Sequence, residues 1–246
     1  MRYFFEVAYN GSNYSGWQSQ KNAIGIQSVI EDALSKLLQQ QIGIIASGRT
    51  DAGVHCEQQF FHADIGNPFD NNFLIRLNSF LPQQIVINNI QPVRADASAR
   101  YDAYERSYRY QITRKKNPFY HGYAWHFFKA IDIKTMNAAA ALLLGERDFE
   151  SFSKVKTDVN HFICTIRKAT WEENDDLLCF HITANRFLRG MVRAIVGTLL
   201  DVGTGKIKAG DFESIITSRD RRKAGANVPA EGLFLTGVKY MPDIFI

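Results

Sequence analysis

A short polar loop at residues 48–55 carries the side chains best suited to chemistry in this chain. Alternating apolar residues on both sides of the loop are typical of strands. Gly48 and Gly53 permit a sharp turn, because glycine adopts positive φ angles at little steric cost. Arg49 and Asp51 would then stand on a rigid turn, where catalytic groups are often placed. The alternative interpretation is a hairpin whose aspartate only hydrogen-bonds its own backbone.

A second candidate group consists of Arg186, Arg189 and Arg193, at spacings of three and four. Residues 186–201 show the apolar period of a helix, so we expect these guanidinium groups on one helix face. Cations in such a row are either solvated or face an anion. An arginine near a buried aspartate favours the ionised carboxylate, which a nucleophile or base requires.

A third candidate is the strand predicted at residues 104–113. Its alternation puts Arg106, Tyr108 and Tyr110 on one face, together with Tyr104. Aromatic rings beside an arginine are unusual for a plain core. They suit a surface that contacts a base and its phosphate.

The elements that would position these residues alternate between strands and helices, which indicates an α+β or mixed α/β class. We expect two domains, each a mainly antiparallel sheet flanked by helices, with the active-site cleft between them. Residues 1–103 would carry the Asp51 loop, and residues 104–246 would complete the cleft and the surface that contacts a base and its phosphate. The predicted strands are 2–9, 42–46, 58–65, 84–93, 104–113, 167–171, 177–184 and 232–240; the predicted helices are 26–40, 73–80, 134–144, 186–201 and 211–217; a polar loop is expected at 154–160.

The composition, with 46% hydrophobic residues, is that of an ordinary globular protein. No apolar run approaches the roughly 20 residues that span a bilayer, and no charged-then-apolar leader opens the chain. We therefore expect neither a membrane protein nor a secreted one. Cys56, Cys164 and Cys179 are odd in number and widely spaced, which predicts free thiols in a reducing cytoplasm rather than zinc ligands or disulfides.

The positive charge is concentrated in the second half of the chain. Residues 101–246 hold 22 of the 29 Lys and Arg residues but 17 of the 25 Asp and Glu residues. Basic clusters at 106–116, 186–193 and 219–223 fit a phosphate backbone, although each is equally well explained as a solvated face.

Several of these stretches resemble one family. The run Gly-Arg-Thr-Asp-Ala-Gly-Val-His at 48–55 resembles the signature loop of the tRNA pseudouridine synthase A family. Residues 187–193 resemble the family's F-x-x-x-M-V-R helix, residues 108–110 its tyrosine-x-tyrosine strand, and residues 231–235 its leucine block. The segment 14–18 resembles its glycine-tryptophan-glutamine element. The chain departs from the family pattern at Asn10, where Asp is more usual, and matches it poorly at 154–160 and 219–223.

The resemblance implies isomerisation of uridine to pseudouridine at positions 38 to 40 of the tRNA anticodon stem-loop. It implies a cytoplasmic homodimer that binds tRNA across its subunits and needs no cofactor or metal. The implied roles are catalysis by Asp51, a charge partner in Arg193, stacking and removal of the C5 proton by Tyr108, packing of the base by Leu233, eviction of the base by Arg49, and RNA contacts by Arg106 and Arg189.

Three alternatives remain open. A paralogous synthase could modify other uridines, and a non-catalytic RNA-binding protein could keep the same scaffold. A metal hydrolase is the weakest, because the spacing of His55, Cys56 and His62 fits no standard zinc pattern.

Overall fold

The computed structural model describes residues 1–20, 22–66, 69–155 and 160–246, so part of the loop expected at 154–160 lies outside the described residues. The chain forms two compact units. Unit 1 consists of Met1–Tyr104 with Phe234–Ile246, and unit 2 of Glu105–Leu233. The chain first leaves unit 1 one residue after the boundary expected at 103. It then returns for residues 234–246, which a division into 1–103 and 104–246 assigns to the second domain.

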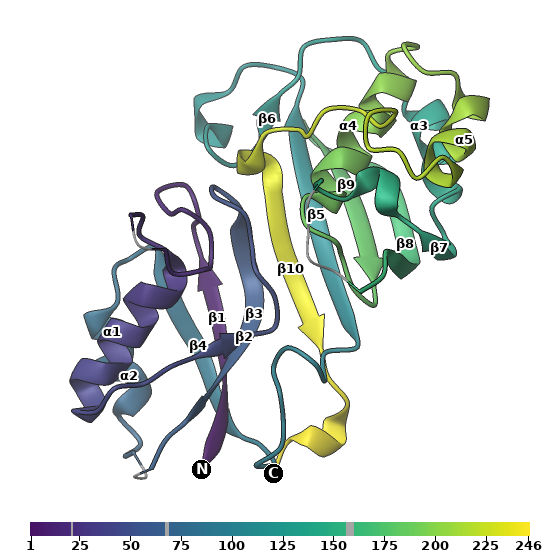
Figure 1. Ribbon diagram of the computed structural model, residues 1–246. Helices are drawn as coiled ribbons and strands as arrows, with labels where there is room; N and C mark the ends of the chain where they lie inside the picture. The colour runs from purple at the N-terminus through teal and green to yellow at the C-terminus, as the bar shows by residue number, and fades with distance from the viewer. Residues whose placement is uncertain (21, 67–68, 156–159) are drawn as a thin grey trace. The chain divides into compact units, whose positions relative to one another are not determined.

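Unit 1 is built on a sheet whose strands lie in the order β4-β1-β3-β10. Strand β1 is antiparallel to β3 and β4, whereas β10 is parallel to β3. Figure 1 shows both helices of this unit on one side of the sheet. The elements are β1 Arg2–Tyr9, α1 Ile26–Leu38, β2 Ile45–Ala46 (paired with β3), β3 His55–Asp64, α2 Phe73–Phe80, β4 Ile85–Pro92 and β10 Leu233–Lys239.

Aromatic side chains fill both faces of this sheet. Phe4 and Phe5 are adjacent in β1 and point to opposite faces, yet both are buried. The Phe5 ring stacks on Phe61 with centroids 4.8 Å apart, and the Phe4 ring meets the edge of Tyr240 at 5.0 Å. Tyr240 also donates its hydroxyl to the Ala99 carbonyl at 2.6 Å. The segment after β10 is therefore an integral part of the core of unit 1.

Unit 2 is built on antiparallel strands in the order β5-β9-β8-β7. The short strand β6 is parallel to β5. Helix α3 packs against α4 and β8, and the three helices gather together in Figure 1. The elements are β5 Glu105–Thr113, β6 Trp125–His126, α3 Ile133–Ala141, β7 Gly145–Asp148, β8 Ile163–Asn174, β9 Leu177–Ala184, α4 Met191–Gly203 and α5 Phe212–Thr217.

The predicted α+β class with mainly antiparallel sheets is confirmed. The strand at 2–9 and the helix at 73–80 have the predicted bounds. Helix α1 ends at Leu38 rather than residue 40, because Gln39 adopts a left-handed conformation with φ 52°. No described helix has the length and apolar character needed to cross a membrane.

The prediction for residues 186–201 is wrong at its beginning. Helix α4 begins at Met191, after Gly190, whose φ of 73° is incompatible with a right-handed helix. Arg186 and Arg189 therefore precede the helix, and only Arg193 lies in it. The expected row of three guanidinium groups on one helix face does not exist.

Candidate active site

The loop that carries Asp51 is a tight turn with a defined geometry. The Val54 amide donates to the Asp51 carbonyl at 3.2 Å, which closes a four-residue turn. Gly53, the third residue of this turn, has φ 78°, the positive value that a type II turn requires there. Asp51 is half-buried and Arg49 is exposed. The predicted role of Gly53 in bending the chain is confirmed.

Gly48 does not share that role. It is not among the positive-φ glycines of the described residues, and a Cβ atom added there would meet nothing within 4 Å. Its carbonyl instead accepts a hydrogen bond from Gln59 Nε2 at 3.2 Å. The beginning of the loop is therefore held by a buried side chain of β3 and not by glycine flexibility.

A second segment clamps the loop from the side. The Trp17 amide donates to the Thr50 carbonyl at 3.2 Å, and the Gly53 amide donates to the Tyr14 carbonyl at 3.3 Å. Gly16 lies so close that an added Cβ would stand 2.4 Å from the Thr50 carbonyl oxygen. Trp17 is 2% exposed, so it packs in the core. Backbone on both sides thus holds Asp51 in place.

The Thr50 side chain gives the loop a further anchor in the core. Its hydroxyl is 2.8 Å from the Tyr9 hydroxyl, and both side chains are buried. Tyr9 ends β1, so this contact ties the residue before Asp51 to an inner strand of the sheet. Sequence reasoning missed both Tyr9 and Gln59 as positioning residues, because their partners are distant in the chain.

His55 has a structural task at the other end of the loop. Its Nδ1 accepts from the Gly11 amide at 3.2 Å, and its ring stacks on Phe234 at 4.6 Å. Within the part of the chain that the structure describes, no group of three or more His, Cys, Asp or Glu side chains is arranged to hold a metal ion.

In unit 2, the predicted residues gather on one face of β5. Arg106 donates from Nη1 to the Asn185 carbonyl at 2.9 Å. The half-buried Tyr108 ring meets the edge of Phe187, with centroids 5.0 Å apart. Both partners belong to the irregular segment 185–190 between β9 and α4. The segment therefore covers the face of β5 that carries Arg106 and Tyr108.

Tyr110, the next residue on this face, is a core residue. It is fully buried, and its hydroxyl donates to the Pro229 carbonyl at 2.8 Å. Burial raises the pKa of Tyr110 far above its usual value, while the nearby positive charge of Arg193 opposes the increase. Arg193 itself is half-buried and donates from Nε to the Val228 carbonyl at 2.7 Å. Arg193, Tyr110 and the segment 228–229 thus form one cluster.

Leu233 lies next to this cluster and is 6% exposed. The glycine before it permits the close approach, since a Cβ on Gly232 would stand 2.6 Å from the Gln111 carbonyl oxygen. Arg189 is exposed, and its carbonyl accepts from the Lys154 amide at 3.0 Å. Unit 1 therefore holds Arg49 and Asp51 on one loop. Unit 2 holds the remaining predicted residues: Arg106, Tyr108, Arg189, Arg193 and Leu233.

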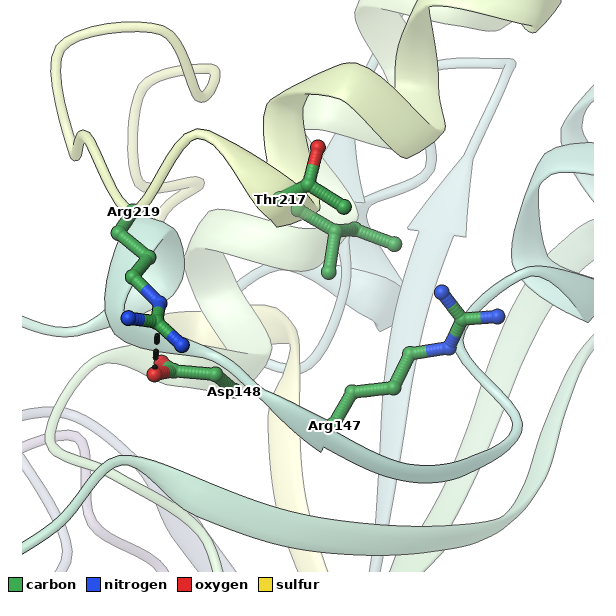
Figure 2. A pocket seen from close by; sticks show the side chains of 5 residues that line it. Arg147, Asp148, Thr217 and Arg219 are labelled. Carbon is green, nitrogen blue, oxygen red and sulfur yellow. Dashed lines mark ion pairs between the residues drawn. The ribbon is translucent and has the colours of Figure 1, made fainter.

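A hollow of about 360 Å³ elsewhere in unit 2 does not coincide with these residues. It is lined by Arg147, Asp148, Ile216, Thr217 and Arg219 (Figure 2). Arg219 Nε and Asp148 Oδ2 form an ion pair at 3.0 Å, and Arg147 pairs with Glu213 at 3.1 Å. Its charges are compensated within the protein, so we do not assign it to the chemistry.

The three cysteines take no part in either group of residues. All three are buried free thiols, as the sequence predicts. Burial raises the pKa of the Cys164 thiol to about 11 and also raises the pKa values of Cys56 and Cys179. These thiols therefore stay protonated at neutral pH and make poor nucleophiles.

In comparisons with known proteins, both groups of residues fall within the sequence of one family. A sequence model of the family described as tRNA pseudouridine synthase matches residues 6–102 and 139–241. Proteins named tRNA pseudouridine synthase A are similar over nearly their whole length. The one from Porphyromonas gingivalis is 47% identical (100% of this chain, 99% of the relative), the one from Parabacteroides distasonis 44% (99% and 98%), and the one from Thermoanaerobacter sp. strain X514 38% (95% and 97%).

Among solved structures, a chain in the "Crystal Structure of a Cbf5-Nop10-Gar1 Complex" matches 94% of this chain and 57% of that chain. Its TM-score of 0.36 and identity of 10% are too low to carry an argument. The sequence comparisons establish the family without the solved structure, since the family match covers both the Asp51 loop and the segment with Arg193 and Leu233. The chain therefore belongs to the tRNA pseudouridine synthase family.

Proposed function

We propose that this chain isomerises uridine to pseudouridine in tRNA, at positions 38 to 40 of the anticodon stem-loop. The observation that carries the proposal is the family match at both groups of residues, together with the clamped turn that holds Asp51. In the reaction the N1–C1′ bond breaks, the uracil turns, and C5 bonds to C1′. The C5 proton leaves and N1 gains one, so the product is an isomer and no cofactor is consumed.

Asp51 is the catalytic residue in this proposal. It either attacks the ribose or abstracts a ribose proton, and both roles require an ionised carboxylate on a rigid support. The turn closed by Val54 and Gly53, with Thr50 bound to Tyr9, provides such a support. Arg193 supplies the positive charge that pairs with the Asp51 carboxylate in this proposal.

The target base is held by Tyr108 and Leu233, one on each side. An aromatic ring stacks on any base, and Tyr108 presents its half-buried ring from β5. A stem uridine must first be extruded, which costs a few kcal/mol of stacking and pairing. Arg49 assists this step from the exposed end of the Asp51 loop, while Arg106 and Arg189 contact the RNA. The active protein is a cytoplasmic homodimer that binds tRNA across its subunits.

The test compares Asp51→Asn with Asp96→Asn, a variant of an exposed aspartate on another loop of unit 1. Release of the uracil C5 hydrogen from labelled tRNA reports the reaction, and sequencing-based mapping locates the pseudouridines. We expect Asp51→Asn to abolish C5-hydrogen release with the melting temperature and tRNA binding near wild type, and Asp96→Asn to behave as wild type. Appreciable turnover by Asp51→Asn would refute the assignment.

Two other outcomes would redirect the proposal. Pseudouridine formed only outside positions 38 to 40 would identify a synthase with another site specificity. Wild-type protein that binds tRNA but forms no pseudouridine would indicate a non-catalytic RNA-binding protein.

A further inference from the structure

The segment that joins β5 to α3 has no role in the site described above. It lies between the two stretches, 6–102 and 139–241, that match the family. No Asp or Glu occurs between Glu105 and Asp132. We call residues 114–129 of this stretch the basic-aromatic loop. Its cations are Arg114, Lys115, Lys116 and Lys129, and its aromatic residues are Phe119, Tyr120, Tyr123, Trp125, Phe127 and Phe128.

Three rings of the basic-aromatic loop are exposed although its backbone is anchored, Tyr123 at 43% and two others to a greater extent. Phe119 is 88% exposed and Phe128 is 78% exposed. The Phe127 amide donates to the Thr113 carbonyl at 3.0 Å, next to Phe128, and strand β6 pairs with the end of β5. The Phe119 amide donates to Asn117 Oδ1 at 3.0 Å, which fixes the turn that carries this ring. An ordered backbone that presents exposed rings lowers the entropic cost of binding a partner.

The charges of this loop are also available. Its four cations are exposed, and none forms an ion pair with a carboxylate among the described residues. The cluster at 219–223 differs in this respect. Arg219 pairs with Asp148, Arg222 pairs with Asp220, and Arg221 donates to the carbonyls of its own loop. The cluster at 219–223 thus has two cations paired with carboxylates, whereas the basic-aromatic loop has none among the described residues.

We propose that the basic-aromatic loop binds the RNA substrate outside the target uridine. Its cations contact backbone phosphates, and Phe119 and Phe128 stack on unpaired bases. The inference rests on the proposed function for the identity of the RNA. Cations interleaved with exposed aromatic rings, without any carboxylate, match the chemistry of single-stranded or looped RNA. A second copy of this chain is less suited to the surface, because like charges would face each other.

The experiment measures tRNA affinity as a function of salt for Lys115→Gln/Lys116→Gln in the Asp51→Asn background, which separates binding from turnover. Loss of two phosphate contacts should make the negative slope of log affinity against log salt shallower by about 1.4 to 1.8. The matched control is Lys168→Gln/Lys206→Gln, which removes the same charge from exposed lysines paired with Glu172 and Asp201. We expect the control to keep the wild-type slope.

The stacking contacts are tested separately with Phe119→Ala and Phe128→Ala. Removal of a ring that stacks on a base should weaken tRNA binding by about 5- to 150-fold. Melting temperatures should stay near wild type, because both rings are exposed. Wild-type slope and affinity in all variants would overturn the proposal. A change in sedimentation at unchanged tRNA affinity would also overturn it, and would identify a contact between copies. If wild-type protein binds with the expected salt slope but forms no pseudouridine, the proposed function fails while this surface stands.

Discussion

Removal of the hydroxyl group from Tyr110 and from Tyr108 should have opposite effects, although both side chains lie on the same face of β5. The Tyr110 ring is fully buried and its hydroxyl donates to the Pro229 carbonyl at 2.8 Å. Tyr110→Phe keeps the ring and leaves that acceptor without its donor. Pro229 is partly exposed, so water can replace the donor in part, and we expect a loss of about 1 to 2 kcal/mol in unfolding free energy.

That loss corresponds to a decrease of about 2 to 8 °C in melting temperature for a chain of this size. The chemical step should persist, because the Tyr110 hydroxyl is bound within the core.

Tyr108→Phe should instead slow the chemical step and leave the stability of the fold unchanged. Its half-buried ring keeps the edge contact with Phe187, so folding and tRNA binding should stay near wild type. If the hydroxyl helps remove the C5 proton, as we expect, release of finished product should slow by about 100-fold or more.

The assay is C5-hydrogen release under single-turnover conditions at saturating tRNA, with melting curves for both variants. Full activity of Tyr108→Phe would reject the proton-transfer role and leave stacking as the only function of this ring. An unchanged melting temperature in Tyr110→Phe would show that the bond to Pro229 contributes nothing to stability. The pair is informative because the same substitution in the same strand separates chemistry from folding.

Two further predictions concern stability. Arg221 donates to the Gly225 carbonyl and to Asn227 Oδ1, both at 2.9 Å. Arg221→Ala should therefore lower the unfolding free energy by about 1 to 2 kcal/mol. Arg222→Ala should leave the melting temperature near wild type, because Arg222 forms only an exposed ion pair with Asp220. Equal melting curves for the two variants would contradict this difference. His62 Nδ1 accepts from the Ala99 amide, and burial lowers the pKa of this side chain in the folded protein. Its contribution to stability is therefore complete above the pKa of about 6.5 in the unfolded chain, and it is lost as the pH falls through the pKa in the folded protein. The melting temperature should therefore decrease from pH 7.5 to 5.5, and it should decrease less steeply in His62→Asn. Part of the pH dependence should remain in that variant, because burial also lowers the pKa of His181. A His62→Asn variant with the full wild-type pH dependence would refute the role of His62.

The sequence predicted most elements of the fold because their apolar periods are long. Strand β1 and helix α2 have the expected bounds for this reason. The predicted start of α4 was wrong because Phe187 and Leu188 continue the apolar period of the helix on its N-terminal side. Gly190, just before the helix, is nevertheless a residue type that often ends helices. Strands β6 and β7 are too short to show any period.

The candidate site was predictable where its residues are consecutive. The turn at Asp51 and the strand with Tyr108 are local patterns. The supports are not local, since Tyr9 reaches Thr50 across 41 residues and Arg193 reaches Val228 across 35. Only the folded chain shows such pairs, because no periodicity relates them. Which phosphates and bases the protein contacts stays a prediction for the same reason.

The return of the chain to unit 1 has a consequence for synthesis on the ribosome. Strand β3, which leads out of the Asp51 turn, pairs with β10, and Tyr240 packs on Phe4. The ribosome must translate the whole of unit 2 before these residues exist. Unit 2 is continuous in sequence and can fold as it emerges, whereas unit 1 waits with an unpaired strand edge and an open core. The pairing of β10 with β3, the strand that follows the catalytic turn, is thus among the last contacts of unit 1 to form, although the residues of the turn are among the first translated.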